Sequence, residues 1–304
     1  MKLGIVSLIL VGMATTAHAQ YAVQQIKDIA YAGNSNRQQT MTICKPINAP
    51  KPMPTYVLIH GGGWYQGDKS ETLMMNTCTR LAKKGYLVAN INYRTVQGHD
   101  ETAPIPNPAL SNTFAAALLD SQLAVRFLRS QANRYGINSG KICSLGYSAG
   151  AHLAVFLGVL KSNYPGDVAG VLSSYSPAVN CVSAHFAPVD LTVAITGPVN
   201  DNGYAPIKSF INVEPIACNV DAYKAASPYY YPLKGSAPMH FTHGDSDTTV
   251  LPFQSLNMKE ALQAAGVKSA RVEYQGGHGF KGLTSTQMWS LIDKSAAWAL
   301  LNAK

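Results

Sequence analysis

The sequence predicts an α/β fold in which a central, mostly parallel sheet carries helices on both faces. Short apolar runs alternate along the chain with longer segments of helical periodicity. The predicted strands are apolar throughout, as expected when helices cover both faces of a parallel sheet. The chain has 304 residues, of which 47% are hydrophobic and 13% charged. This balance fits a globular core and excludes a disordered chain.

The strands and helices follow from periodicity and from glycine and proline punctuation. Buried-type apolar runs predict strands at 56–59, 86–93, 142–146, 181–187, 239–243 and 270–274. Amphipathic or apolar helical patterns predict helices at 71–84, 112–135, 149–160, 253–265 and 284–301. In the first helix, for example, Leu73, Met74, Cys78 and Leu81 share one face.

Between residues 188 and 238 the alternation of strand and helix patterns stops, and the segment is rich in Gly, Pro, Asn and Tyr. Long irregular segments inside a domain are usually functional loops, so we expect an insertion here. No internal repeat and no linker to a second domain is visible in the sequence. We therefore expect residues 20–304 to form a single domain.

The first 19 residues have the pattern of a bacterial-type signal peptide. Lys2 gives a positive start, 3–13 is apolar, and Ala17-His18-Ala19 is a small-x-small cleavage site. The sequence thus predicts a periplasmic or secreted protein whose mature chain begins near Gln20. No later run reaches about 18 uninterrupted apolar residues, so an integral membrane segment is not expected.

Charge and cysteine spacing exclude several other classes. The formal net charge is +8, but the cations are scattered and no stripe of Lys and Arg interleaves with aromatics. This distribution argues against a nucleic-acid partner. No CxxC and no His/Cys cluster at zinc spacing occurs, so no metal is expected. The sequence does not indicate an oligomeric state.

Export would allow the five cysteines to form disulfides. Their odd number leaves at least one unpaired within the chain. Cys143 lies in an apolar strand run and is expected to be an inert buried thiol. The other four allow three pairings, of which we expect Cys44 with Cys78 and Cys181 with Cys218.

A GxSxG motif spans Gly146 to Gly150. It falls between a predicted buried strand and an apolar helix, where a tight turn strains the central residue and requires glycines two positions away on either side. Such a turn would lift the Ser148 hydroxyl clear of the sheet and aim the first helix amides at the same point. The alternative is an ordinary glycine turn.

A second glycine motif, His60-Gly61-Gly62-Gly63-Trp64, follows the 56–59 strand. Three consecutive glycines let the backbone approach a substrate and expose its amides, as an oxyanion-binding loop requires. No phosphate-binding GxxxxGK[ST] or helix-opening GxGxxG is present. His60 is expected to shape the loop. Trp64 is expected either to line an acyl pocket or to pack in the protein interior. Tyr147 is the second expected pocket residue.

A serine nucleophile needs a base and a carboxylate that orients it. The histidines that follow Ser148 are His152, His185, His240, His243 and His278. His278 lies in a glycine-rich turn after the last predicted strand, whereas the other four fall on a helix or on strands and are expected to be core residues. The carboxylate is Asp245 or Asp247, and the spacing leaves both open. Asp190 is a third candidate that more simply caps a turn.

With these motifs in place, the chain resembles the α/β-hydrolase superfamily over residues 55–301. It is most similar to the hormone-sensitive-lipase-like and bacterial feruloyl/acetylxylan-esterase-like branches. The matching stretches are His60 to Trp64, Asn92 to Arg94, Ala124 to Arg129, Gly146 to Leu153, Ala226 to Pro228, His243 to Ser255, and His278. The resemblance implies that Asp247, in an HGxxDxxVP-like segment, is the acid of a Ser148-His278-Asp247 triad. It also implies that Gly62, Gly63 and Ala149 supply the oxyanion amides.

The resemblance implies a serine carboxylesterase that needs no cofactor and acts on small esters, either short-chain or linked to an aryl or carbohydrate group. The sequence does not select among feruloyl, acetylxylan and simple aryl esters. One alternative is an amide hydrolase, a peptidase or arylformamidase, with the same triad. Another is an exported, non-catalytic binding protein that retains the fold.

Overall fold

The computed structural model describes residues 20–97, 113–162, 164, 172–194, 207–208, 210–211 and 219–304. The predicted signal peptide, the proline-rich loop that contains Pro104, Pro106 and Pro108, and Cys218 lie outside the described residues.

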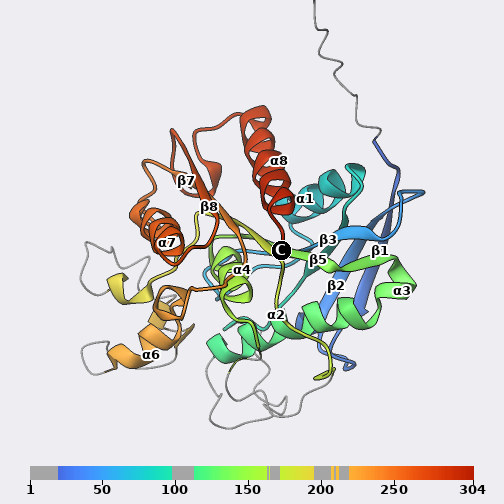
Figure 1. Cartoon of the computed structure of the whole chain (residues 1–304), viewed down its shortest axis with the longest axis horizontal. Helices are drawn as coiled ribbons and strands as arrows, with labels where there is room; N and C mark the ends of the chain where they lie inside the picture. The colour runs from blue at the N-terminus through green and yellow to red at the C-terminus, as the bar shows by residue number, and fades with distance from the viewer. Residues whose placement is uncertain are drawn as a thin grey trace, which may run out of the picture.

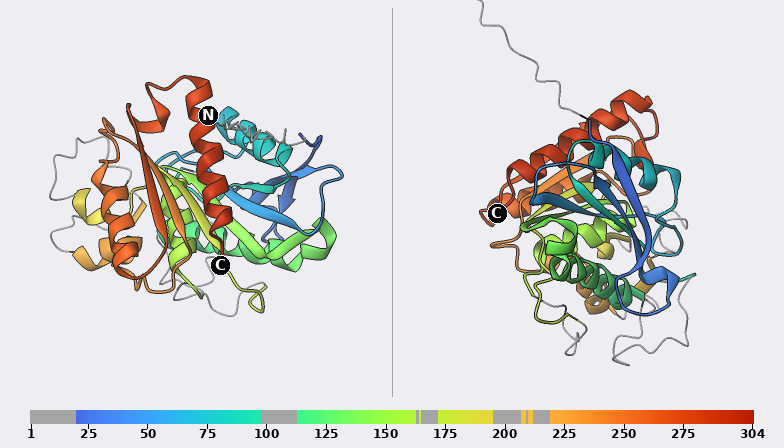
Figure 2. Two further views of the ribbon diagram at one scale, coloured as in Figure 1. Left: turned by 45° about the horizontal axis from the view of Figure 1, so that its top comes forward. Right: turned by 90° about the vertical axis from the view of Figure 1, so that its right-hand side faces the viewer.

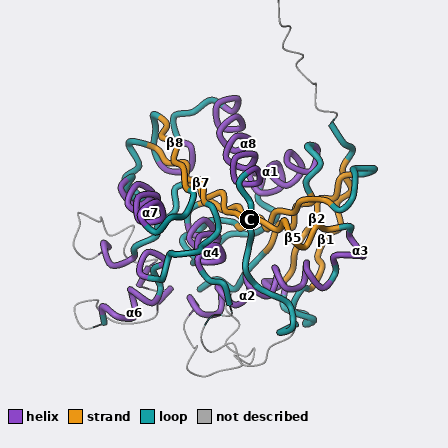
Figure 3. Tube along the Cα trace, viewed as in Figure 1, coloured by secondary structure: helices purple, strands orange, loops and turns teal. Residues whose placement is uncertain are grey.

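One sheet runs through the middle of the molecule, with strand order β1-β2-β4-β3-β5-β6-β7-β8 (Figure 1). The strands are β1 Val23–Ala30, β2 Thr40–Pro46, β3 Met53–Ile59, β4 Leu87–Ile91, β5 Ile137–Tyr147, β6 Cys181–His185, β7 Met239–Gly244 and β8 Ser269–Tyr274. β2 pairs antiparallel with β1 and β4, and the pairs from β4 to β8 are parallel. In Figure 3 these strands form a central layer between helices.

Helices cover both faces of this sheet, which confirms the predicted fold class (Figure 2). The α-helices are α1 Thr72–Lys83, α2 Thr113–Ser130, α3 Ala132–Tyr135, α4 Ala149–Val159, α6 Val220–Ala225, α7 Phe253–Ala264 and α8 Ser285–Leu301. Short 3-10 helices are η1 Arg37–Gln39, η3 Leu191–Ala194, η5 Pro228–Tyr230 and η6 His278–Phe280. In the described part of the chain, no helix is long and apolar enough to cross a membrane.

Alternation along the strands divides the core into two clusters. In β3, Val57 and Ile59 pack with residues of α2, α4 and α7 on one face. Tyr56 and Leu58 point the other way and pack with residues of α1 and α8. Because both faces are buried, the strand has no polar side, which explains its uninterrupted apolar run.

The structure adds two strands that the sequence patterns did not predict. β1 carries Gln24, Gln25, Lys27 and Asp28, and most of its side chains are exposed or half-buried, so it lacks the apolar run of a central strand. β2 follows it as an antiparallel neighbour. The single helix predicted over 112–135 is two helices in the structure. The first, α2, ends at Ser130, and the second, α3, ends at Tyr135 because Gly136 adopts a left-handed conformation (φ 73°).

One of the two expected disulfides is confirmed, and the other is wrong. Cys44 on β2 is bonded to Cys78 on α1. Cys181 is bonded to Cys143 rather than to Cys218, so Cys143 is not a free thiol. Cys143 and Cys181 lie directly opposite each other on the paired strands β5 and β6, with Cα atoms 4.6 Å apart. That spacing brings their sulfurs within bonding reach.

Candidate active site

Ser148 lies between the end of β5 and the start of α4, in a strained backbone conformation. Its φ of 51° and ψ of −120° are rare for a residue with a side chain. The backbone is held there because the Ser148 amide donates to the His185 carbonyl oxygen at 3.0 Å. The half-buried side chain leaves the sheet at the carboxyl edge of the parallel strands.

The glycines on either side of Ser148 are required by close backbone contacts. A Cβ on Gly146 would lie 2.2 Å from the Gly150 carbonyl oxygen. A Cβ on Gly150 would lie 2.3 Å from both the Ile59 and His60 carbonyl oxygens. The N-terminus of α4 therefore sits against the end of β3, as the tight turn expected from the GxSxG motif demands.

Gly150→Ala is expected to destabilise the protein by about 3 kcal/mol or more, because the added methyl group meets rigid backbone rather than a movable side chain. Urea unfolding of purified protein measures the effect. Gly140→Ala is the control, since Gly140 is exposed and the nearest atom to its added Cβ is Asn138 Oδ1 at 3.4 Å. Equal stability of the two variants would contradict this account of the turn.

His278 joins Ser148 to Asp247 by two hydrogen bonds. Its Nε2 lies 2.9 Å from Ser148 Oγ, and its Nδ1 lies 2.8 Å from Asp247 Oδ2. The histidine opens η6, which follows β8, and Gly279 next to it adopts a left-handed conformation (φ 70°). The His278 side chain is 24% exposed, so the imidazole remains accessible from solvent.

The structure distinguishes the two candidate carboxylates. Asp247 is buried, and its Oδ1 accepts from the Thr249 and Val250 amides at 2.9 Å each. Burial opposes its ionisation, but hydrogen bonds from His243 and His278 outweigh burial and hold the pKa of Asp247 well below its usual range. Asp245 is exposed and instead accepts from the Gly276 amide at 2.9 Å. The geometry therefore brings Asp247, and not Asp245, to His278.

The glycine loop after β3 lies against the nucleophile turn. A Cβ on Gly61 would lie 3.4 Å from Ser148 Cβ and 3.0 Å from the Tyr147 carbonyl oxygen. Gly62 and Gly63 have φ of 106° and 61°, which glycine adopts readily. The loop therefore brings Gly61 against the nucleophile turn, and Gly62 and Gly63 follow it in sequence, while Ala149 is the first residue of α4.

Two buried histidines shape this loop. His60 stacks on Tyr93 with ring centroids 4.3 Å apart, and its Nδ1 lies 2.7 Å from the Gly61 carbonyl oxygen. His152 Nδ1 accepts from Trp64 Nε1 at 3.2 Å, and its Nε2 donates to the Ala226 carbonyl oxygen at 2.8 Å. Both are structural residues, as the sequence predicted.

The two expected pocket residues are packed in the interior. Trp64 is 3% exposed, and its ring stacks on Phe210 with centroids 4.5 Å apart. Tyr147 is also 3% exposed, its ring stacks on His185, and its hydroxyl lies 2.9 Å from Thr77 Oγ1. For Trp64 the placement favours the packing alternative. The expectation for Tyr147 needs correction, because its ring points into the core shared with α1 and α8.

The other polar candidates also have structural roles. His185, His240 and His243 are buried on β6 and β7, as expected of core histidines. Asp190 accepts from the Thr192 amide at 2.9 Å and from Thr192 Oγ1, so it caps a turn as predicted. Within the described residues, no group of three His, Cys, Asp or Glu side chains is placed to hold a metal ion.

Stability is expected to fall as the pH drops from about 6.5 toward 4. Burial lowers the pKa of His60, His152 and His240 to about 4 and that of His185 to about 3. Unfolding returns each to about 6.5, so between these values the unfolded chain binds more protons. Each histidine then costs about 1.4 kcal/mol of stability per pH unit. Urea unfolding at pH 7.5, 6 and 5 checks this, and equal stability at all three would contradict it.

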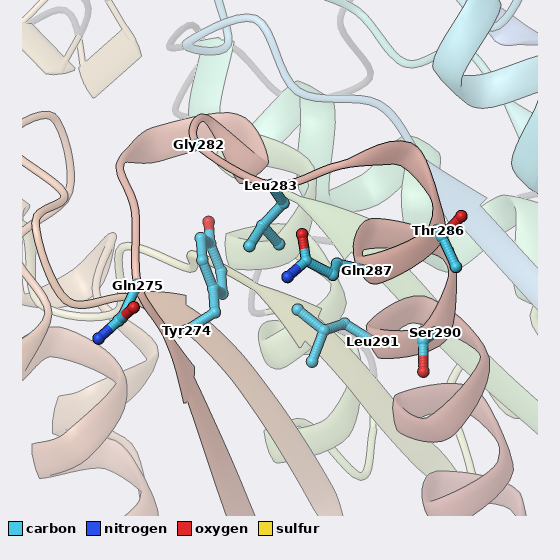
Figure 4. A pocket seen from close by; sticks show the side chains of 8 residues that line it. All are labelled: Tyr274, Gln275, Gly282, Leu283, Thr286, Gln287, Ser290 and Leu291. Carbon is cyan, nitrogen blue, oxygen red and sulfur yellow. The ribbon is translucent and has the colours of Figure 1, made fainter.

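A groove of about 510 Å³ lies between the end of β8 and the first turns of α8 (Figure 4). Its lining residues are Tyr274, Gln275, Gly282, Leu283, Thr286, Gln287, Ser290 and Leu291. Tyr274 connects the groove to the loop that carries His278, because its hydroxyl donates to the Gly277 carbonyl oxygen at 2.9 Å and accepts from the Phe280 amide at 3.2 Å. Ser148 is not among the lining residues, so this groove is separate from the nucleophile.

Comparison with known families identifies the chain. The BD-FAE family model matches residues 41–262, which is more than half of the sequence. The chain belongs to the BD-FAE family. This BD-FAE protein is 28% identical to esterase LipQ of Mycobacterium tuberculosis over 260 residues, covering 84% of this chain and 56% of LipQ. It is 23% identical to the isoprenylcysteine alpha-carbonyl methylesterase ICME of Arabidopsis thaliana, covering 88% of this chain and 60% of ICME.

Solved structures agree with the family. A truncated carbohydrate esterase from gut microbiota superimposes on the BD-FAE chain with a TM-score of 0.75 and 25% identity, covering 92% of this chain and 98% of that one. Thermogutta terrifontis esterase 2 phosphonylated by sarin shares the fold, with a TM-score of 0.69 at 21% identity, covering 91% of this chain and 93% of that one. The BD-FAE protein thus has the α/β-hydrolase fold of these structures. It spans about half the length of the curated relatives it matches.

Proposed function

We propose that the protein is a serine carboxylesterase that hydrolyses small carboxylic esters through Ser148, His278 and Asp247. The observation that carries this proposal is the unbroken hydrogen-bond chain from Ser148 Oγ through His278 to Asp247, built on a strained turn beside a glycine loop. The names of the relatives LipQ and ICME support ester hydrolysis.

The geometry supports acyl transfer in two halves. His278 Nε2 accepts the Ser148 proton as Oγ attacks the ester carbonyl carbon, and the alcohol leaves with the proton returned by His278. The Gly62, Gly63 and Ala149 amides then stabilise the oxyanion of the tetrahedral intermediate. A water molecule then takes the place of the alcohol: His278 accepts its proton as its oxygen attacks the acyl-enzyme carbonyl carbon, and Ser148 Oγ leaves with the proton returned by His278 as the acid is released. Asp247 holds the Nδ1–H tautomer and stabilises the imidazolium that forms.

The acyl and alcohol groups are a further part of the proposal. Similarity to the carbohydrate esterase from gut microbiota favours an ester carried on a sugar, and the relatives named esterases fit short acyl chains as well. A small-molecule ester substrate, with no nucleic acid partner, is therefore the class to test first.

Export and domain organisation belong to the same proposal. The signal-like first 19 residues, together with the Cys44–Cys78 and Cys143–Cys181 disulfides, support a periplasmic or secreted protein. Residues 20–304 then form a single α/β-hydrolase domain.

The direct test is hydrolysis of p-nitrophenyl esters from acetate to palmitate by the protein from residue 20 onward. We expect activity that peaks at short chains and labelling of Ser148 by a fluorophosphonate probe. Cleavage of anilides but not esters would point to an amide hydrolase instead. Absence of both hydrolysis and labelling would favour a binding protein with the same fold.

A further inference from the structure

A second histidine touches the carboxylate that orients His278. His243, near the end of β7, is fully buried and lies four residues before Asp247. Its Nε2 lies 2.8 Å from the Val250 carbonyl oxygen and 3.4 Å from Asp247 Oδ2. Its Nδ1 lies 2.8 Å from Ser255 Oγ on α7. None of the acyl-transfer steps uses this residue.

The partners of His243 determine where its proton lies. The Val250 carbonyl oxygen and the Asp247 carboxylate can only accept, so Nε2 carries a hydrogen. On the other side, Arg271 Nε donates to Ser255 Oγ at 2.9 Å. The Ser255 hydroxyl hydrogen is then free to be donated to His243 Nδ1 at 2.8 Å, in preference to the Pro252 carbonyl oxygen at 3.2 Å.

The donors in this network therefore point one way, from Arg271 through Ser255 to His243, whose Nε2–H faces the Val250 carbonyl oxygen at 2.8 Å and Asp247 Oδ2 at 3.4 Å. The positive charge of Arg271 is balanced by Glu273 rather than by Asp247, because the two side chains form an ion pair at 2.7 Å. The Arg271 side chain is 11% exposed, so the network reaches the surface only at that end.

His243 completes the set of donors around Asp247. The Thr249 and Val250 amides hold Oδ1, and His278 and His243 both approach Oδ2. Without His243, His278 would be the one donor near Oδ2 among the described residues, so less would hold the carboxylate plane against rotation about Cβ–Cγ. His243 also holds the carbonyl of Val250, the residue whose amide binds Oδ1.

We propose that His243 is a positioning residue for hydrolysis, which fixes the Asp247 oxygen that orients His278. The proposal rests on the proposed function, since it matters only if His278 acts as the base. His243 contacts neither Ser148 nor the glycine loop in the described structure, so it should affect turnover and leave substrate binding unchanged.

The tautomer is tested first, on the unaltered protein. Long-range 1H–15N NMR of the imidazoles at pH 7.5 should show a proton on His243 Nε2. A His243 that carries its proton only on Nδ1 would overturn the proposal, because Nε2 could not then donate to Asp247. This measurement does not depend on any variant folding.

A matched pair of amide variants then tests the contact itself. In His243→Gln the longer side chain can place an N–H near the former Nε2, beside Asp247 and Val250. In His243→Asn the amide reaches only toward Ser255, near the former Nδ1. Both variants keep a buried polar group, and their melting temperatures report any general loss of packing.

We expect His243→Asn to lower kcat about 10- to 100-fold, the worth of one hydrogen bond to a charged group, with KM changed less than about twofold. His243→Gln should recover most of this loss. Equal kcat in both variants, whether normal or reduced, would overturn the proposal. Ester hydrolysis by the wild type, and its absence in Ser148→Ala, tests the proposed function separately.

Discussion

Ser148→Ala is expected to lower ester turnover by at least about a thousandfold while leaving the fold intact. Alanine removes the oxygen that His278 Nε2 contacts at 2.9 Å, so no acyl-enzyme can form. The residual rate comes from the oxyanion amides and from substrate binding. Steady-state hydrolysis of p-nitrophenyl acetate measures the effect, and the same preparation should fail to react with a fluorophosphonate probe.

Ser246→Ala provides the control. Ser246 is exposed at the same edge of the sheet, next to Asp247 in sequence, and its hydroxyl donates to Asp245. Its loss should leave turnover within about twofold, as for a surface substitution that disturbs no buried group. Hydrolysis retained by a contaminant-free Ser148→Ala preparation would disprove the nucleophile assignment.

Asp247→Asn is expected to lower turnover by roughly a thousand- to ten-thousandfold at neutral pH. The carboxylate accepts hydrogen bonds on both oxygens, and an amide can accept on only one. Its NH2 group, if turned to His278, would favour the tautomer with the proton on Nε2. That nitrogen then faces Ser148 Oγ with a hydrogen and cannot take the serine proton.

Asp245→Asn is the matched substitution, since it makes the same chemical change two residues away. Asp245 is exposed and binds the Gly276 amide, a bond that the asparagine oxygen can still accept. We expect near-normal turnover from this variant and a collapse only from Asp247→Asn, both measured by kcat on p-nitrophenyl acetate. The reverse result would show that Asp245 is the functional acid.

Much of the fold could be predicted because its central strands are buried on both faces. β3, β5 and β7 each appear in the sequence as an apolar run, and the helices between them have apolar faces of their own. β1 was not predicted because it is an edge strand with exposed Gln and Lys side chains and has no apolar run. Its place was set by pairing with β2, which is a tertiary property.

The site was predictable where local backbone geometry dictates the residues. Gly146 and Gly150 must lack a side chain, so the turn that presents Ser148 is visible in the sequence. The choice between Asp245 and Asp247 was different, because both follow the same strand. Only the packing of His278 against one of them decides it, and the spacing of the sequence carries no such information.

The predicted Cys181–Cys218 pairing and the pocket role of Tyr147 failed for related reasons. Cys143 and Cys181 come together because β5 and β6 are neighbours in register, and strand order cannot be read from apolar runs. Tyr147 precedes the nucleophile in sequence, but the alternation of side chains along β5 turns its ring into the core that β5 shares with α1 and α8. The sequence predicts His243 to be a core histidine, and its contact with Asp247 becomes visible only in three dimensions.

The long segment 186–238 leaves the sheet after β6 and returns in β7, and these two strands are hydrogen-bonded neighbours. Its described parts meet the glycine loop where Phe210 stacks on Trp64, and meet α4 where the Ala226 carbonyl accepts from His152. Strand pairing holds β6 and β7 together on either side of the segment, so we expect a change in its length to leave Ser148, Asp247 and His278 in place. Exchange of this stretch between relatives, with the Phe210 and Ala226 contacts kept, is therefore a rational route to chimeric proteins.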